Sequence, residues 1–306
     1  MKIVIATPMY GGNSKSVYVS CLTQLTGLLN QAGHQVNLMS ITNESLITRA
    51  RNTLAHMFMK SDADALLFID GDHGWVSEDI VKMVNSGKDL IGAIYPMKSI
   101  NWENVRKAAL AGRPNLELYS GNFAVNFLPE PQNFTADEPF KVRDVGTGMM
   151  FIRRNVFEEM AKSDLVKRYK NNSPSVDIDM GEEIVEYFTT YITPEPEAIL
   201  LSEDYAFCDI WRKLGHDAWA APWVRITHAG EFNFPGYFLN TLEIQGQIQA
   251  SDTSTLTQTV PEELSQADSL QSLDTIFDGS ASESGLDSAP QQSAEEKVQK
   301  PARKKS

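Results

Sequence analysis

Cysteine is scarce in this chain of 306 residues, which holds only Cys21 and Cys208. Their separation matches no zinc-binding spacing, and two cysteines in so long a chain do not make a disulfide framework. Long apolar runs are also missing, since no stretch approaches the roughly 20 apolar residues of a membrane-spanning helix. The apolar start of the chain is interrupted by Pro8 before it reaches the length of a signal sequence. We therefore expect a soluble protein in a reducing compartment, the cytoplasm.

Positive charge is in deficit, with 27 Lys and Arg against 40 Asp and Glu, which gives a formal net charge of -13. A nucleic-acid backbone or an anionic membrane favours a positive surface, so neither is expected as the main partner. Hydrophobic residues make up 42% of the chain, enough for one sizeable core.

Several motifs of common enzyme classes are absent. The chain has no Gly-x-Ser-x-Gly elbow, no GxxxxGK[ST] loop and no GxGxxG that opens a helix. Serine-hydrolase, P-loop and dinucleotide-binding chemistry are therefore not supported.

What the chain does contain is an alternation of short apolar strands with amphipathic helices. This pattern is typical of an α/β protein with a mostly parallel sheet flanked by helices. We expect strands at 2–7, 34–41, 63–70 and 89–95, with helices at 15–32, 45–61 and 77–87 between them. The alternation is lost over 96–141 and returns with a strand and helix at 149–160, a strand at 183–192, a helix at 202–215 and a late strand before 228. Ser77, and Asn155 with Glu158, are predicted helix caps.

Composition changes after about residue 250. Residues 251–306 are rich in Ser, Asp, Glu and Gln and poor in large apolar side chains, so they cannot bury enough surface to offset the entropy of ordering. We predict one domain over 1–250 and a disordered acidic tail over 251–306. Its basic end, Lys300 to Lys305, could dock an acidic partner, although a solvated tail is the simpler interpretation.

Asp70 and Asp72 follow the apolar run Leu66 to Ile69 at the point where a buried strand ends. In parallel α/β sheets, ligands bind beyond the carboxyl ends of the strands. Two carboxylates there could form an oxygen-rich site for Mg²⁺ or Mn²⁺, a pair of general acid and base groups, or merely a turn.

Other polar groups stand at similar places. Glu203 and Asp204 open a predicted helix, where acids are favoured by the helix dipole but could also serve as a general base. His228 follows the late strand and precedes two small residues, which would leave room for a ligand; a lone histidine is more often structural. Arg51 and Asn52 could bind a phosphate or a base, or could form an ordinary exposed helix face.

The order of these motifs resembles that of the GT-A glycosyltransferases, in particular glycosyltransferase family 2. The resemblance covers residues 1–235 and joins "ATPMYGG", "TRARN", "LLFIDGD", "VGTGMM", "SEDYAF" and "ITHAG". It implies a GT-A (Rossmann-like) fold and transfer of a sugar from a nucleotide-diphosphate sugar, with UDP- or GDP-sugars as the first choice. The acceptor would be a hydroxyl on a glycan, lipid or protein, and the cofactor Mn²⁺ or Mg²⁺.

The resemblance also implies roles for single residues. Asp72, Asp70 and His228 would bind the metal, and Asp204, beside Glu203, would be the catalytic base of an inverting reaction. The residues implied to bind the donor are Thr7, Pro8, Tyr10, Arg51, Asn52, Asp70, Gly146, Thr147 and Gly148. His73 has no assigned role.

Two other functions stay open. A sugar-phosphate nucleotidyltransferase shares the α/β layout and the paired carboxylates, and it usually carries a basic glycine-rich loop that "TPMYGGNSK", with Lys15, partly matches. A non-catalytic nucleotide-sugar-binding or scaffold protein could have kept the fold and use its tail for interaction.

Overall fold

The computed structural model describes residues 1–130, 134–173, 178–230 and 234–246. The predicted tail, 251–306, and its basic end lie outside the described residues. None of the described helices is both long and apolar enough to cross a bilayer.

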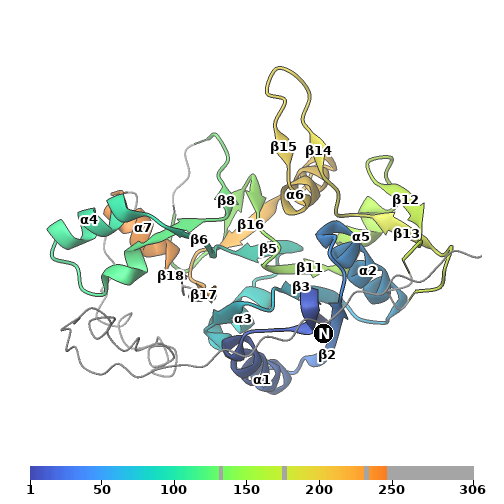
Figure 1. The fold of residues 1–306 in the computed structure, drawn as a ribbon, viewed down its shortest axis with the longest axis horizontal. Coiled ribbons are helices and arrows are strands. Elements are labelled where there is room, and N and C mark those ends of the chain that lie inside the picture. The colour runs from blue at the N-terminus through green and yellow to red at the C-terminus, as the bar shows by residue number, and fades with distance from the viewer. Residues whose placement is uncertain (131–133, 174–177, 231–233, 247–306) are drawn as a thin grey trace, which may run out of the picture. The chain divides into compact units, whose positions relative to one another are not determined.

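A seven-stranded sheet forms the centre of the described part of the chain (Figure 1). Its strands are, in spatial order, β2 (Gln35–Thr42), β1 (Lys2–Met9), β3 (Ala65–Ile69), β11 (Met149–Arg153), β5 (Leu90–Ala93), β16 (Ala218–Ala221) and β9 (Phe140–Val142). Parallel pairing joins β2 to β1, β1 to β3, and β5 to β16. The strand β11 runs antiparallel between β3 and β5, and β9 runs antiparallel along β16. The predicted α/β class with a mostly parallel central sheet is confirmed.

Helices cover both faces of this sheet. The helices α1 (Ser16–Gln31) and α3 (Ser77–Val84) pack on one face, and α2 (Ile47–Lys60), α5 (Arg154–Met160) and α6 (Glu203–Lys213) pack on the other. On β3, Leu66 and Phe68 face the second group while Leu67 and Ile69 face the first. A strand covered on both faces needs apolar side chains at consecutive positions. This explains the unbroken run that precedes Asp70.

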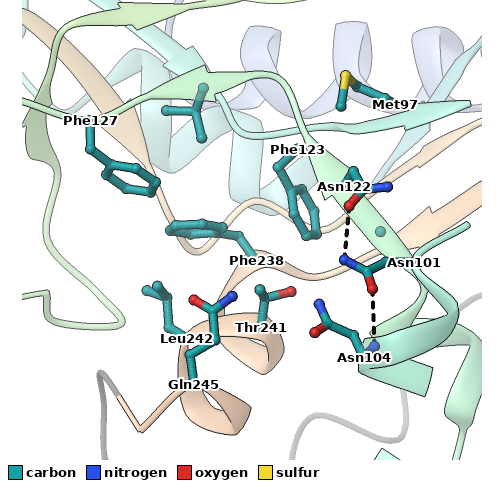
Figure 2. Close-up of a pocket in the computed structure, with 12 residues that line it drawn as sticks. Met97, Asn101, Asn104, Asn122, Phe123, Phe127, Phe238, Thr241, Leu242 and Gln245 are labelled. Atoms are coloured by element: carbon teal, nitrogen blue, oxygen red, sulfur yellow. Dashed lines mark hydrogen bonds between the residues drawn. The ribbon is translucent and has the colours of Figure 1, made fainter. Parts of the chain in front are cut away.

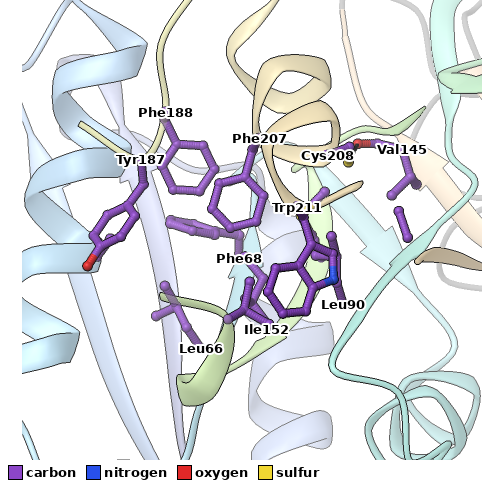
Figure 3. Packing of buried hydrophobic residues seen from close by; sticks show 14 of the residues in the cluster. Leu66, Phe68, Leu90, Val145, Ile152, Tyr187, Phe188, Phe207, Cys208 and Trp211 are labelled. Atoms are coloured by element: carbon purple, nitrogen blue, oxygen red, sulfur yellow. Dashed lines mark hydrogen bonds between the residues drawn. The ribbon is translucent and has the colours of Figure 1, made fainter. Parts of the chain in front are cut away.

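An aromatic cluster anchors α6 to the sheet. The rings of Phe188 and Phe207 are stacked with centroids 4.5 Å apart, and Phe68 meets Phe188 edge-on at 5.4 Å (Figure 3). Trp211, from the next turn of α6, is 1% exposed. This packing fixes the start of α6, which carries Glu203 and Asp204, over the carboxyl end of β3.

The segment without a sequence pattern, 96–141, contains β6 (Pro96–Ile100), α4 (Trp102–Leu110), a short 3-10 helix (Leu116–Tyr119), β7 (Gly121–Phe123) and β8 (Val125–Asn126), and ends in β9. The strands β6 and β7 form an antiparallel pair, and β8 pairs with β10 (Asp144–Val145). The late elements β18 (Phe234–Gly236) and α7 (Phe238–Ile244) pack against this segment. A second small sheet joins β18 to β17 (Ile226–His228) and β4 (His73–Trp75).

Three local predictions are wrong. The Ser77 hydroxyl is not a helix cap, because it lies buried and bonds to Cys21 and Gln24 of α1. Asn155 does not cap α5 either, because that helix already begins at Arg154 without a side-chain cap. The strand expected over 183–192 is divided between two hairpins: β12 (Lys167–Lys170) with β13 (Glu183–Glu186), and β14 (Tyr191–Ile192) with β15 (Leu200–Leu201).

Candidate metal centre

The loops after β1 and β3 meet at one edge of the sheet. Both strands run in the same direction, so both end at that edge. The Lys15 backbone N–H donates to the Gly71 carbonyl at 2.8 Å, which ties the first loop to the turn between Asp70 and Asp72. The carboxyl end of β3, where the sequence predicts a ligand site, therefore lies beside the loop that follows β1.

Three potential metal ligands converge just beyond this turn. The strand β4 pairs antiparallel with β17, and this register sets His73 opposite His228. The Ala229 N–H donates to the Asp72 carbonyl at 2.7 Å and holds the turn beside β17. One ligand atom each from Asp72, His73 and His228 lies within 4.8 Å of the others. We call these three residues the triad.

Both histidines of the triad are oriented by backbone carbonyls. Nδ1 of His73 lies 2.9 Å from the Gly148 carbonyl oxygen, and Nδ1 of His228 lies 2.8 Å from that of Pro96. A carbonyl oxygen only accepts, so each Nδ1 carries a proton, and Nε2 is the atom of each ring that could bind a metal. Metal-binding histidines are typically held in this way. Nε2 of His73 is buried and has no hydrogen-bond partner among the described residues.

The pKa shifts of Asp72 and His73 favour a bound cation. Burial lowers the pKa of the His73 imidazole, which keeps the ring neutral. Burial alone would raise the pKa of the Asp72 carboxyl, but hydrogen bonds from His228 and Lys98 outweigh it and hold that pKa well below its usual range. Lys98 Nζ lies 2.6 Å from Asp72 Oδ2, and His228 Nε2 lies 3.3 Å from the same oxygen. The triad therefore offers one carboxylate and the Nε2 atoms of two imidazole rings.

Asp70 lies outside the triad and is held by Arg51 of α2. Arg51 Nη2 lies 3.1 Å from Asp70 Oδ1, and Arg51 Nε lies 3.3 Å from Glu203 Oε1. The Arg51 side chain is only 4% exposed. Burial opposes its charge, yet the two carboxylates outweigh this effect and raise the pKa of Arg51. Arg51 thus links the end of β3 to the start of α6.

Asp204 lies next to this ion pair, at the start of α6. Its carboxylate accepts hydrogen bonds from the Ser202 hydroxyl and, at 2.9 Å, from the Tyr205 N–H. Burial raises the pKa of the nearby Tyr95 hydroxyl, and the charges of Asp70 and Asp204 raise it further. Burial also raises the pKa of the Glu203 carboxyl, with Arg51 opposing. The structure therefore brings the predicted Glu203 and Asp204 to the same region as Asp70.

The predicted glycine turn, Gly146 to Gly148, is buried beneath the site. A Cβ at Gly146 would stand 2.0 Å from the Tyr95 hydroxyl, and one at Gly148 would stand 2.4 Å from Cε1 of His73. Thr147 is 1% exposed. The two glycines make room for Tyr95 and His73, so they position side chains of the site.

Replacing Gly146 with alanine is therefore expected to lower the free energy of unfolding by about 1–3 kcal/mol through overpacking against Tyr95. Adding Tyr95→Phe, which removes the hydroxyl that the new Cβ meets first, should recover part of the loss. Gly27→Ala in α1 is the matched control, because its Cβ meets nothing within 4 Å; it should stabilise by about 0.5–1 kcal/mol. Urea unfolding measures all three. Equal stability of Gly146→Ala and the wild type would contradict the packing role.

Two of the other residues predicted to bind the donor, Thr7 and Asn52, have side chains that are hydrogen-bonded within the protein. The Thr7 hydroxyl bonds to the Tyr18 hydroxyl at 2.5 Å and is buried. The Asn52 amide donates to the Phe188 carbonyl and accepts from the Phe188 N–H, both at 2.8 Å. Both residues thus support the fold beside the site. Pro8 is half-buried at the end of β1, and Tyr10, 74% exposed, follows it.

His73 is the member of the triad that the sequence argument left without a role. Its place next to Asp72 was the only signal available. The pairing of β4 with β17, which joins residues about 150 positions apart, is what turns His73 toward His228.

The chain matches no protein-family model and no curated protein. Among solved structures it is partly similar to A197 from STIV, at 15% identity and a TM-score of 0.39, over 75% of this chain and 86% of that chain. It is also partly similar to a glycosyltransferase involved in the glycosylation of the major capsid of PBCV-1, at 8% identity and a TM-score of 0.27, over 54% and 69% of the two chains. A putative glucose-1-phosphate thymidylyltransferase from Bacillus anthracis is 11% identical with a TM-score of 0.26, over 58% and 79%. These neighbours include a glycosyltransferase and a nucleotidyltransferase, at low identity.

Proposed function

We propose that this chain is a metal-dependent glycosyltransferase of GT-A fold that moves a sugar from a nucleotide-diphosphate sugar to a hydroxyl acceptor. The observation that carries the proposal is the convergence of Asp72, His73 and His228 within 4.8 Å. They converge beyond the carboxyl end of β3, which is where ligands bind in sheets of this kind. The order of motifs along the chain supports the choice of sugar transfer.

The triad would hold a divalent cation, for which its donor set favours Mn²⁺ over Mg²⁺. Mg²⁺ prefers an all-oxygen shell, whereas imidazole nitrogen suits transition metals. Three protein ligands leave positions for oxygens of the donor diphosphate. When bound, the cation offsets negative charge on the departing diphosphate.

Lys98 and Arg51 would act through the two carboxylates of the turn, Lys98 at Asp72 and Arg51 at Asp70. Lys98 supplies a second positive charge at Asp72, with a side chain that is 43% exposed and free to turn toward a phosphate. Arg51 is a positioning residue: it fixes Asp70, whose carboxylate, 31% exposed, would accept hydroxyls of the donor ribose. Fixed charges of this kind stabilise a charged transition state without reorganisation.

Asp204 would take the proton of the attacking hydroxyl. It stands at the start of a rigid helix, and hydrogen bonds from Ser202 and from the Tyr205 N–H set its orientation. One base suffices for direct displacement at the anomeric carbon, so the proposed reaction inverts the configuration. The uracil or guanine base of the donor would lie near Pro8 and the exposed Tyr10.

Asp204→Asn is expected to lower donor turnover by about 100- to 10,000-fold, the usual contribution of a general base. Release of nucleoside diphosphate from a panel of nucleotide sugars measures it, with Mn²⁺ and simple glycosides as acceptors. Donor binding should be unchanged, because Asp204 is not in the triad. Asp217→Asn is the matched control, since Asp217 is a surface partner of Lys141.

An unchanged rate in Asp204→Asn would remove Asp204 as the base. Pyrophosphate release from a nucleoside triphosphate and a sugar phosphate would instead identify a nucleotidyltransferase.

A further inference from the structure

A pocket with a cavity volume of about 350 Å³ lies among β6, β7, α4 and α7 (Figure 2). Three aromatic rings and three asparagine amides dominate its lining: Phe123, Phe127, Phe238, Asn101, Asn104 and Asn122. None of its described lining residues is an acid, a base or a histidine. A cavity of this size, mostly apolar with a few polar groups, is typical of a small-ligand site.

One of the amides has no partner. Asn101 Nδ2 donates to Asn122 Oδ1 at 2.9 Å, and Asn122 Nδ2 donates to Ser99 Oγ at 2.9 Å. The side-chain amides of Asn101 and Asn122 therefore both have hydrogen-bond partners within the protein. Asn104 is 7% exposed, and its backbone N–H donates to Asn101 Oδ1 at 3.0 Å. Its side-chain amide makes no hydrogen bond within the described ranges and faces the pocket beside Thr241 (Figure 2).

The Asn104 amide is therefore available to a ligand in the pocket, as two donors and an acceptor. The Thr241 hydroxyl next to it is buried and has no partner among the described residues. A buried hydroxyl of this kind costs free energy unless a ligand supplies the missing hydrogen bond. The two groups together point to a ligand that carries both donors and acceptors.

The chemistry of the lining narrows the class of ligand. Amides and a hydroxyl both donate and accept, as sugar hydroxyls do. The faces of aromatic rings are electron-rich and attract the slightly positive C–H groups of a sugar ring. A phosphate or a charged peptide would have no counter-charge among these residues. The pocket thus suits an uncharged sugar ring.

The strand β6 connects this pocket to the triad. Met97 lines the pocket, while the Pro96 carbonyl orients His228 and Lys98 pairs with Asp72. Successive side chains of a strand point to opposite faces. On β6, the side chain of Met97 therefore lies at the pocket and that of Lys98 at the triad.

We propose that this pocket binds a neutral sugar unit, which is part of the acceptor if the proposed glycosyltransferase function holds. Asn104 would hydrogen-bond the sugar hydroxyls, and Phe123, Phe127 and Phe238 would pack against the ring.

Saturation-transfer NMR on the full chain tests the proposal. The probes are methyl glycosides of glucose, galactose, mannose, N-acetylglucosamine, rhamnose, fucose and xylose, without donor and without metal. At least one glycoside is expected to bind, and Asn104→Leu is expected to weaken it tenfold or more. Leucine is the better helix former and the lost amide has no partner, so this variant should unfold at no lower temperature. Phe127→Ala should also weaken binding, because it removes one of the three rings that line the pocket. Phe127 is 40% exposed, so its truncation should cost less stability than that of a fully buried ring.

Asn30→Leu, at an exposed position of α1, is the control and should bind like the wild type. Absence of binding by every glycoside, or equal binding by the wild type and Asn104→Leu, would overturn the proposal. The measurement needs no donor, so glycoside binding without any sugar transfer would defeat only the proposed function. Donor hydrolysis without glycoside binding would defeat only the pocket.

Discussion

Replacing His73 with asparagine is expected to weaken Mn²⁺ binding at least about 100-fold while the metal-free protein stays folded. Asparagine can still donate to the Gly148 carbonyl from the position of Nδ1, but it has no atom at the position of Nε2. In the metal-free protein Nε2 has no partner, so its removal breaks no hydrogen bond. The space left by the ring should cost about 1–3 kcal/mol of unfolding free energy.

His73→Gln is the complementary variant. Glutamine places a polar atom near Nε2 and loses the bond to the Gly148 carbonyl, so it should bind Mn²⁺ better than His73→Asn yet unfold more easily. Titration calorimetry with Mn²⁺ and thermal unfolding without metal measure the two effects separately. Wild-type Mn²⁺ affinity in His73→Asn would exclude this histidine as a ligand.

Arg51→Met is expected to cost about 3 kcal/mol of unfolding free energy, the low end for breaking a buried ion pair. The low end applies because the Asp70 side chain is 31% exposed and water can compensate part of its charge. Glu203, 15% exposed, would be left next to Asp70 without its cation. Adding Glu203→Gln should recover part of the loss, since it removes one of the two unpaired charges.

The pH dependence of this loss has a definite sign. Burial already raises the pKa of Glu203, and removing Arg51 takes away the group that opposes the rise. A raised pKa in the folded state means that stability is retained below the ordinary glutamate pKa of about 4.3 and lost as the pH rises through the folded value. The deficit of Arg51→Met should therefore be small near pH 4 and grow toward neutral pH.

Arg106→Met is the matched control for Arg51→Met. Arg106 pairs with Glu103 on the surface of α4, where both side chains are more than half exposed. Such pairs contribute about 0–1 kcal/mol. Urea unfolding at pH 4 and pH 7 compares the two variants, and equal losses for both would contradict a buried role for Arg51.

The strand and helix pattern of residues 1–95 could be predicted because each element there is encoded locally. Apolar runs of five or six residues mark strands covered on both faces, and the 3.6-residue period marks the helices between them. The same logic located Asp72 at the end of β3 and Asp204 at the start of α6. These positions depend on the nearest strand or helix alone.

The remaining features depend on contacts between distant segments. The role of His73 follows from the pairing of β4 with β17, and the glycines at 146 and 148 from the rings of Tyr95 and His73. The Asn52 amide is engaged by the backbone of Phe188, 136 positions away. The pocket likewise joins 97–127 to α7. No local pattern encodes such contacts.

Thermal unfolding of the full chain with UDP-, GDP-, CDP- and TDP-sugars, each with Mn²⁺ and with EDTA, tests the proposed transferase most directly. A ligand that binds only the folded state raises the unfolding temperature. One nucleotide sugar should do so with Mn²⁺ and fail to do so with EDTA, and Asp72→Asn should abolish the shift. If no nucleotide sugar raises the unfolding temperature in the presence of Mn²⁺, the chain does not bind such a donor at this site.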